Sequence, residues 1–388
     1  MKVFRLQTLI WVVGFAAVVV LAQLLTSARK APSQRTETDV AIYDEESHEA
    51  EKALGTDPSW KPLLEEIGVI QLGRSPGGGS VQNYCLDGDG KLLVCRGGSF
   101  SRVKDPTTRR TEVVNEPAEV CVFSPSGECL NAWPQPCKLQ AICVSPNGHI
   151  FAAGSGRVLR LDAEGRVVAS VETPVANAPV AITPEIEEIL KQQNRLNPTE
   201  LEKMKKSLER RRADVPGIAA TETDVFVVCP TPSDFAYRIY RFDHDLKESK
   251  LVLEKLRGCC GQLDIQAHDG RLWVAHNGRH RVEAYDREGR LLSQFGKRGR
   301  VRPEDFGGCC EPKNVRIAPD GDVLAAESGP PSCIKRFTAE GRFLGVVAIA
   351  ESMKGDCVRM TVAVSPDGSR YYLLDTTKDV VRVFGKRS

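Results

Sequence analysis

Residues 259–296 have the sequence CCGQLDIQAHDGRLWVAHNGRHRVEAYDREGRLLSQFG, and this stretch decides the fold. It predicts four short strands, LDIQA, RLWVAH, HRVEAYD and LLSQFG, in which apolar and polar residues alternate. Asp269-Gly270 separates the first two strands and Glu288-Gly289 the last two; such dipeptides are typical of the turns that join antiparallel strands. The stretch therefore predicts one four-stranded antiparallel sheet.

The same pattern recurs at intervals of roughly 45 to 50 residues, a period typical of propellers and solenoids. The other copies begin near Gly79, Cys137, Gly217, Cys310 and Cys357. The last copy has only three strands, and the segment GVIQLG at 68–73 resembles the outer strand LLSQFG. We expect this segment to complete the last sheet, because closing the ring removes the open sheet edges. The sequence predicts an all-β, six-bladed β-propeller of four-stranded antiparallel blades over residues 64–388.

Two segments carry a more specific pattern, in which an apolar strand and a DG turn precede a strand of the form RVxxFD. They are Arg279-His280-Arg281-Val282 and VVRVFG at Val380–Gly385. This pattern resembles that of NHL-repeat six-bladed β-propellers over about residues 64–388. The resemblance implies the fold but says little about function, because such propellers include extracellular sensors, RNA or protein binders, and metal-dependent lyases and hydrolases.

Residues 184–213 interrupt the repeat with helix-forming residues. Thr183 and Asn197-Pro198-Thr199 are typical of helix N-termini, so we expect a helical hairpin between the second and third blades. Its second arm carries the candidate partner-binding residues Lys203, Lys205, Lys206, Arg210, Arg211 and Arg212. A solvated helix face explains such charges, and a lid or protein-binding arm is the alternative.

The N-terminus differs from the rest of the chain. An uncharged run from Leu6 to Ser27 is long enough to cross a bilayer, so we predict a transmembrane signal anchor at residues 1–28. Cleavage at a small-residue site is the alternative, and it would give a secreted protein. Either case places the propeller on the periplasmic or extracellular side. Residues 29–63 are acidic, and we predict that they form a flexible tether.

The charge of the chain is nearly balanced, with 53 basic and 51 acidic residues and a net charge of +2. The chain has no long basic stripe. We therefore expect no nucleic acid among its partners and expect a membrane and a protein instead.

Four cysteines occupy the same place in four of the repeats. Cys137, Cys259, Cys310 and Cys357 each lie eleven residues before the glycine of a turn, and Cys260 and Cys309 adjoin two of them. Loops that enter the inner strands of a propeller share one rim of the central channel, so we expect these thiols to converge there. Five further candidates end the second strands on the same face: His276, and the auxiliary residues Cys95, Cys229, Glu327 and Asp375. Asp375 is also expected to cap its own loop, a habit of aspartate.

Three chemistries are open to these thiols. They can bind zinc, copper or an iron–sulfur cluster, with His276 adding a nitrogen ligand. The adjacent pairs can form strained, redox-active disulfides, because their Cα atoms are only about 3.8 Å apart whereas disulfides prefer about 4.4–6.8 Å. Exported cysteines can also form structural disulfides between blades.

Each of these chemistries corresponds to a possible function of the protein. We expect a binding or electron-transfer module with a cysteine-lined metal or redox site, rather than an enzyme. The alternative is a protein-interaction scaffold with structural disulfides. A metal-dependent hydrolase or lyase ranks third, because the chain lacks the several His or carboxylate channel ligands of such enzymes.

Overall fold

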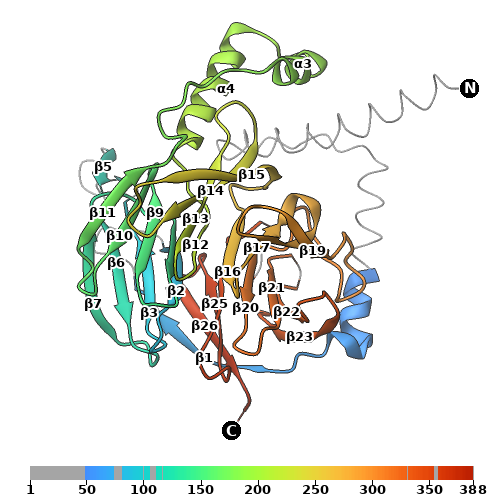
Figure 1. The fold of residues 1–388 in the computed structure, drawn as a ribbon. Coiled ribbons are helices and arrows are strands. Elements are labelled where there is room, and N and C mark those ends of the chain that lie inside the picture. The colour runs from blue at the N-terminus through green and yellow to red at the C-terminus, as the bar shows by residue number, and fades with distance from the viewer. Residues whose placement is uncertain are drawn as a thin grey trace, which may run out of the picture.

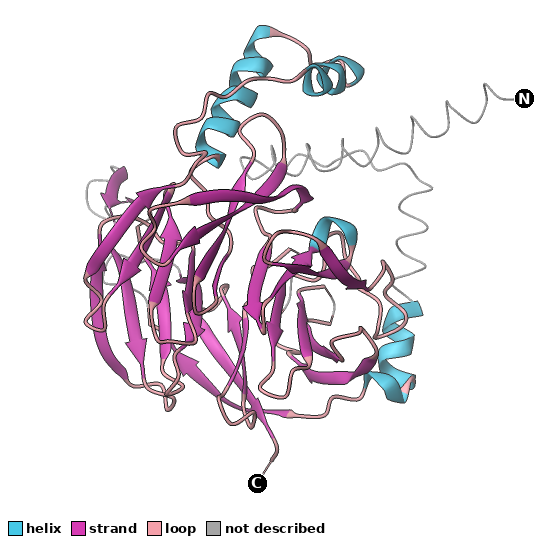
Figure 2. Ribbon diagram, viewed as in Figure 1, coloured by secondary structure: helices cyan, strands magenta, loops and turns pink. Residues whose placement is uncertain are grey.

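The computed structural model describes residues 49–73, 81–98, 100–104, 111–115, 117–329, 331–353 and 357–387. Six four-stranded antiparallel sheets are arranged as blades around a central axis (Figure 1), and strands far outnumber helices in the described residues (Figure 2). The inner strands are β2, β8, β12, β16, β20 and β24, and each lies beside the inner strands of both neighbouring blades. The predicted six-bladed β-propeller is therefore confirmed.

The first three blades follow the chain in order. Blade one consists of β2 (Val81–Leu86), β3 (Leu92–Arg96), β6 (Ala118–Phe123) and β7 (Cys129–Gln135). Blade two consists of β8 (Ala141–Val144), β9 (Ile150–Gly154), β10 (Arg157–Leu161) and β11 (Val167–Glu172). Blade three consists of β12 (Ile218–Ala220), β13 (Asp224–Pro230), β14 (Ala236–Asp243) and β15 (Ser249–Arg257). A two-stranded sheet that was not predicted, β4 (Phe100–Lys104) with β5 (Thr111–Asn115), lies between β3 and β6 in the sequence.

The last three blades carry most of the candidate site. Blade four consists of β16 (Asp264–His268), β17 (Arg271–His276), β18 (Arg281–Asp286) and β19 (Leu291–Phe295), with the short 3-10 helix η2 (Asn277–Arg279) after β17. Blade five consists of β20 (Asn314–Ile317), β21 (Val323–Glu327), β22 (Cys333–Phe337) and β23 (Phe343–Ile349). Blade six consists of β24 (Val362–Val364), β25 (Tyr371–Asp375), β26 (Val380–Gly385) and β1 (Glu65–Gln71).

The ring closes as predicted, through β1. This strand pairs antiparallel with β26, from Glu65 opposite Gly385 to Gln71 opposite Val380. Ile70 is buried in the apolar core that blades one and six share, together with Leu72 directly after the strand. The N-terminal part of the propeller therefore completes the last blade.

The hydrophobic core lies between neighbouring blades rather than at one centre. Between blades four and five, for example, Trp273 and Val282 face Val315 and Phe337. Alternating residues of each strand point to the two faces of its sheet, so each blade buries apolar side chains against both neighbours.

The inserted helical hairpin is also confirmed. Helices α3 (Pro184–Gln192) and α4 (Pro198–Arg211) begin at the predicted caps: Thr183 accepts a hydrogen bond from the Ile186 amide at 3.4 Å, and Asn197 accepts one from the Glu200 amide at 3.0 Å. Apolar residues of the two helices pack together in a small core of their own. The hairpin projects from the ring between blades two and three (Figure 1).

The predicted flexible tether is corrected in part, because its described end packs on the propeller. Residues 49–56 are helical, and the 3-10 helix η1 (Pro58–Trp60) follows. Trp60 is buried against Cys333 and Val346 of blade five. Its indole N–H donates to the Val301 carbonyl at 3.0 Å. A tryptophan removes a large apolar area from water, which accounts for the docking of this segment.

The predicted membrane anchor, residues 1–28, lies outside the described residues, as do residues 29–48 of the tether. In the part of the chain that the structure describes, no helix has the length and apolar character to span a membrane.

Candidate metal centre

Five cysteines gather at one mouth of the channel, from three consecutive blades. Cys259 and Cys260 precede β16, Cys309 and Cys310 precede β20, and Cys357 precedes β24. The turns that lead into three inner strands therefore deliver all five thiols to one place. This convergence was predicted from their shared position in the repeat.

The sulfur atoms lie within contact distance of one another. The Sγ atom of Cys310 is 3.3 Å from that of Cys309 and 3.6 Å from those of Cys260 and Cys357. Cys259 is 3.6 Å from Cys260, and Cys309 is 3.0 Å from Cys357. The sulfurs of Cys259, Cys260, Cys309 and Cys310 all lie within 4.8 Å of one another. Four thiols thus have the spacing of a metal-ligand set.

Two of these cysteines adopt an unfavourable backbone conformation. Cys260 has φ +55° and Cys357 has φ +63°, in the left-handed region that non-glycine residues seldom occupy. Holding such residues there costs on the order of 1–3 kcal/mol each, and strain of this kind clusters at functional sites. The backbone is therefore bent at an energetic cost at the positions that bring these thiols into the cluster.

A buried lysine accompanies the cluster. The ammonium of Lys313 is 2.7 Å from the sulfur of Cys310 and 3.7 Å from a carboxylate oxygen of Glu311. Burial lowers the pKa of Lys313, but the negative charges of Glu311 and Cys310 outweigh it and raise that pKa overall. Hydrogen bonds from Cys259 and Cys260 lower the pKa of Cys310 to about 3. This shift favours the thiolate form of Cys310, the form that binds metals.

The pKa values of the other thiols in the cluster are also shifted. Hydrogen bonding within the cluster raises the pKa of Cys260 and of Cys357, while it lowers that of Cys309. Protons are thus shared unequally among sulfurs that touch one another. Metal binding would release these protons, because a metal needs the thiolate form of each ligand.

Two more ionisable residues lie near the thiols. Glu311 accepts hydrogen bonds at Oε1 from the Ser328 amide at 3.1 Å and from its hydroxyl at 2.7 Å. Its buried Oε2 has no hydrogen-bond partner among the described residues, and burial raises the pKa of Glu311 to about 8. The buried Nδ1 of His280 likewise has no hydrogen-bond partner in the described parts of the chain. Burial lowers the pKa of His280, and the charges of Cys310 and Cys309 oppose that effect.

Three residues near the thiols were not predicted as members of the site: Lys313, Glu311 and His280. The signal for the first two was present, since CEPKN at 310–314 places both within three residues of a clustered cysteine. Lysine and glutamate are usually solvent-exposed, so only the fold shows that these two are buried.

The predicted metal-ligand role of His276 is corrected, because both of its ring nitrogens are already in use. Nε2 accepts the amide N–H of Arg257 at 2.9 Å, so the proton is on Nδ1, which donates to Glu283 at 2.6 Å. Arg281 and Tyr285 also donate to this carboxylate, each at 2.6 Å. His276 therefore supports blade four and offers no lone pair to a metal.

Replacing His276 with alanine is expected to destabilise the protein by about 2–4 kcal/mol, because it leaves the partly buried Arg257 amide without an acceptor and the buried Glu283 without one of its donors. Chemical denaturation measures this loss. The metal content of this variant should not change, whereas Cys259→Ser and Cys310→Ser should lower it. A His276→Ala protein that keeps its stability but loses metal would restore the ligand role.

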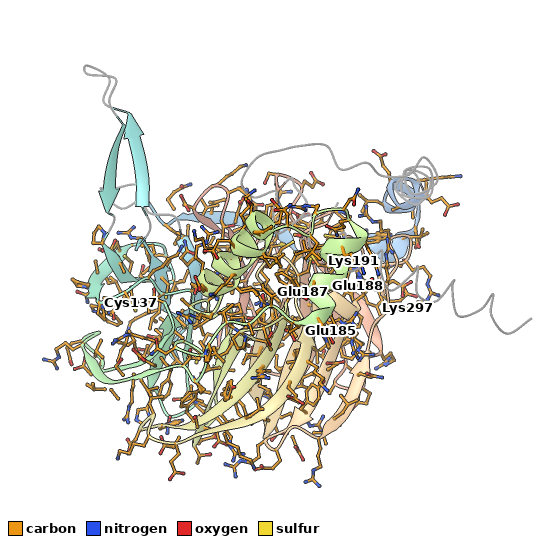
Figure 3. All side chains as sticks on the ribbon, turned by 90° about the horizontal axis from the view of Figure 1, so that it is seen from above. Cys137, Glu185, Glu187, Glu188, Lys191 and Lys297 are labelled. Atoms are coloured by element: carbon orange, nitrogen blue, oxygen red, sulfur yellow. The ribbon has the colours of Figure 1, made fainter. Side chains whose placement is uncertain are left out.

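Cys137 lies apart from the thiol cluster. It packs against the core between blades one and two, and its sulfur is 3.8 Å from the Gly154 carbonyl. Figure 3 places it among the strands of these first two blades. Blade two faces blade five across the channel in a ring of six, so a shared position in the repeat does not bring Cys137 to Cys310.

The four auxiliary residues also have structural roles in the blades. Cys95 and Cys229 are fully buried in apolar cores, and burial raises the pKa of both thiols. Glu327 pairs with the buried ammonium of Lys335 and accepts the Gly307 amide at 2.7 Å. Asp375 accepts the amide and the hydroxyl of Thr377 at 3.1 and 2.6 Å, which is the loop cap predicted for it.

The basic residues of α4 fall into two groups. Arg211 donates to the carbonyls of Asp234 and Phe235 at 2.9 Å, and Arg212 donates to that of Ala178 at 2.8 Å, so these two fix the hairpin to the ring. The exposed residues are Lys203, Lys205, Lys206 and Arg210. A partner-binding role for this exposed group stays a prediction.

None of the thirteen cysteines, all of which lie in described residues, takes part in a disulfide bond. The predicted structural disulfides and redox-active adjacent disulfides are therefore not seen.

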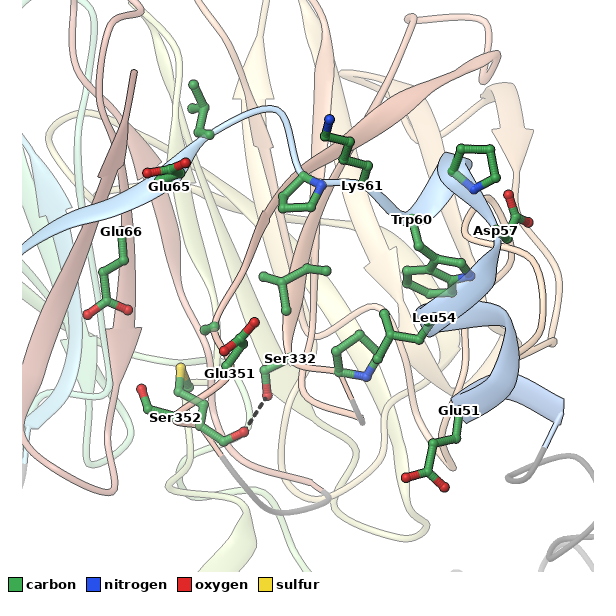
Figure 4. Close-up of a pocket in the computed structure, with 18 of the residues that line it drawn as sticks. Glu51, Leu54, Asp57, Trp60, Lys61, Glu65, Glu66, Ser332, Glu351 and Ser352 are labelled. Atoms are coloured by element: carbon green, nitrogen blue, oxygen red, sulfur yellow. Dashed lines mark hydrogen bonds between the residues drawn. The ribbon is translucent and has the colours of Figure 1, made fainter. Parts of the chain in front are cut away.

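A second concave feature lies outside the ring of blades. A pocket of about 1340 Å³ separates residues 51–66 from the loops of blades five and six (Figure 4). Acidic side chains dominate its charged lining, which comprises Glu51, Asp57, Lys61, Glu65, Glu66 and Glu351. Ser328, which hydrogen-bonds to Glu311, also lines it.

Comparisons with known proteins return only solved structures of low sequence identity. No protein-family model and no curated protein matches the sequence. Among solved structures, an inactive virginiamycin B lyase from Staphylococcus aureus with quinupristin is 11% identical and matches 82% of this chain and 99% of its own, with a TM-score of 0.46. The Cps50 (Swd1) β-propeller domain of Myceliophteria thermophila is 12% identical over 84% and 100% of the two chains, with a TM-score of 0.45. The Neurospora crassa Pan2 WD40 domain is 11% identical over 84% and 96%, with a TM-score of 0.44.

Proposed function

We propose that this protein is a membrane-tethered, extracytoplasmic binding or electron-transfer module that holds a soft metal at the mouth of its propeller channel. The single observation that carries the proposal is the cysteine cluster, in which four sulfurs lie within 4.8 Å of one another. Thiolate ligands select zinc, copper(I) and iron.

The sulfur spacing supports individual ions rather than a large cluster. A tetrahedral zinc site has zinc–sulfur bonds of about 2.3 Å, which places its sulfurs about 3.8 Å apart. The adjacent sulfurs here lie 3.0–3.6 Å apart, so each needs to move only slightly. The cysteines of a [4Fe–4S] cluster bind different iron atoms, which separates them further.

Export of the propeller, which stays a prediction, would add a reason for metal binding. Clustered thiols in an oxidising compartment form disulfides, whereas thiolates bound to a metal are protected from that reaction. The identity of the metal then decides the role. Zinc has no redox chemistry and would make a binding site, while copper or iron would permit electron transfer.

The test is the metal content of the full chain, purified in detergent without oxygen. We expect at least one ion per chain after reconstitution. We expect Cys259→Ser and Cys310→Ser to lower the affinity by at least about tenfold, because the loss of even an outer-shell partner costs about 10–100-fold. Cys137→Ser is the matched control, because it removes a half-buried thiol outside the cluster. A protein that binds no zinc, copper or iron, or a Cys137→Ser variant as impaired as Cys310→Ser, would overturn the proposal.

A further inference from the structure

The cluster contains five cysteines, which is more than one metal ion binds. A tetrahedral ion takes four sulfurs, yet a fifth, that of Cys357, lies 3.0 Å from Cys309 and 3.6 Å from Cys310. It comes from a third blade and from a residue with strained backbone, φ +63°. Because holding it there has an energetic cost, Cys357 requires its own explanation.

Cys310 is the centre of the arrangement. Its sulfur contacts those of Cys260, Cys309 and Cys357, at 3.3–3.6 Å. The side chain is completely buried, whereas that of Cys309 is exposed. The remaining thiols therefore divide around Cys310 into the pair from blade four and the pair formed by Cys309 and Cys357.

We propose that the five cysteines bind two copper(I) ions that share the sulfur of Cys310. Cys259, Cys260 and Cys310 hold the inner ion, and Cys309, Cys310 and Cys357 hold the outer ion. This inference rests on the proposed function, since it requires that the thiols bind metal at all.

The number of donors supports two three-coordinate ions. Two such ions have six ligand positions, and five sulfurs fill all six when one of them bridges. Two tetrahedral ions would have eight positions, and the same five sulfurs would leave two of them unfilled. Copper(I) is a soft ion that thiolates select and that accepts three sulfur ligands, while zinc in protein sites is almost always four-coordinate.

The surroundings of Cys310 suit a bridging thiolate. A sulfur that binds two ions keeps one further lone pair, and the ammonium of Lys313 lies 2.7 Å from this sulfur to donate to it. Two monovalent ions and five thiolates carry three negative charges, and the buried Lys313 offsets one of them. Lys313 is therefore a positioning residue, because it acts on the metals through Cys310.

The burial of the thiols predicts an order of release. The inner ion would lie beside the buried Cys259, while the outer ion would lie beside the exposed Cys309. A chelator should therefore remove the outer ion first, and the two losses should appear as separate steps.

The test is copper stoichiometry by native mass spectrometry, on the full chain loaded without oxygen with copper(I) in acetonitrile. We expect two ions per chain in the wild-type protein and in the Cys137→Ser control. Cys357→Ser and Cys259→Ser should each retain one ion. Cys310→Ser should lose the stepwise release and bind both ions at least about tenfold more weakly. Circular dichroism checks that each variant keeps its fold.

Three outcomes would overturn the inference. One copper per chain that Cys357→Ser leaves unchanged would show a mononuclear site, and the proposed function would stand. Full retention of both ions by folded Cys310→Ser would show that this sulfur does not bridge, and again the proposed function would stand. No copper, zinc or iron in the wild-type protein would overturn both the inference and the proposed function.

Discussion

Replacing Lys335 with methionine is expected to destabilise the propeller by about 3–5 kcal/mol, the usual cost of leaving a buried charge without its partner. Lys335 is fully buried in blade five, where its ammonium pairs with Glu327 and donates to the Asp305 carbonyl at 2.6 Å. Burial lowers the pKa of Lys335, but the charge of Glu327 outweighs burial and keeps that pKa above its ordinary value. The variant would leave the Glu327 carboxylate as an unpaired buried charge.

The double variant Lys335→Met with Glu327→Gln separates loss of the ion pair from loss of packing. Glutamine keeps an oxygen for the Gly307 amide, which Glu327 accepts at 2.7 Å, and removes the unpaired charge. We expect the double variant to recover more than half of the loss, because removing both members of a buried ion pair costs less than removing one. Equilibrium denaturation of the wild type, both single variants and the double variant measures the coupling. Equal losses in Lys335→Met and in the double variant would contradict this explanation.

The ion pair also matters to the thiol cluster, since both of its members fix the loop that ends in Cys309 and Cys310. Glu327 holds the Gly307 amide, and Lys335 holds the Asp305 carbonyl. The indole of Trp60 lies over the same ammonium at 5.3 Å. The N-terminal segment, the ion pair and the loop that carries Cys309 and Cys310 thus form one packed unit in blade five.

The fold was largely predictable because its signals are local. Each hairpin carries its own alternation and turn residues, as in Asp269-Gly270, and the repeat multiplies this signal along the chain. The β4–β5 sheet was missed because its strands are joined by DPTTRR, which has no turn glycine. The docked segment around Trp60 was missed because acidic neighbours surround a single aromatic residue, and its contacts with blade five are distant in sequence.

The candidate site was predictable in position but not in membership. The position of a residue within the repeat predicts how far along the channel axis it lies. This was enough to predict that Cys259, Cys310 and Cys357 share one rim. It does not say on which side of the channel a blade stands, and Cys137 lies on the far side. Nor does it show hydrogen bonding, which is what removes His276 from the ligands.

Deleting residues 1–72 is expected to abolish cooperative folding, whereas deleting residues 1–48 is not. The longer deletion removes β1 and leaves the edge of β26 unpaired along Val380–Gly385. It also removes the buried Ile70 and Leu72 from the core between blades one and six and removes Trp60 from blade five. Burying a large apolar side chain stabilises by about 1.5–3 kcal/mol, so three of them together rival the whole stability of a typical domain.

The matched deletion of residues 1–48 keeps every one of these contacts. We expect it to give a monomer with one sharp thermal transition, and we expect the longer deletion to aggregate, since an unpaired apolar strand edge pairs with other molecules. Size-exclusion chromatography and thermal unfolding followed by circular dichroism distinguish the two. Adding back a synthetic peptide of residues 57–73 to the longer deletion should restore part of the monomer, because strand pairing can be supplied by a separate chain. A monomeric, cooperatively folded 73–388 fragment would show instead that the ring is stable without its closing strand.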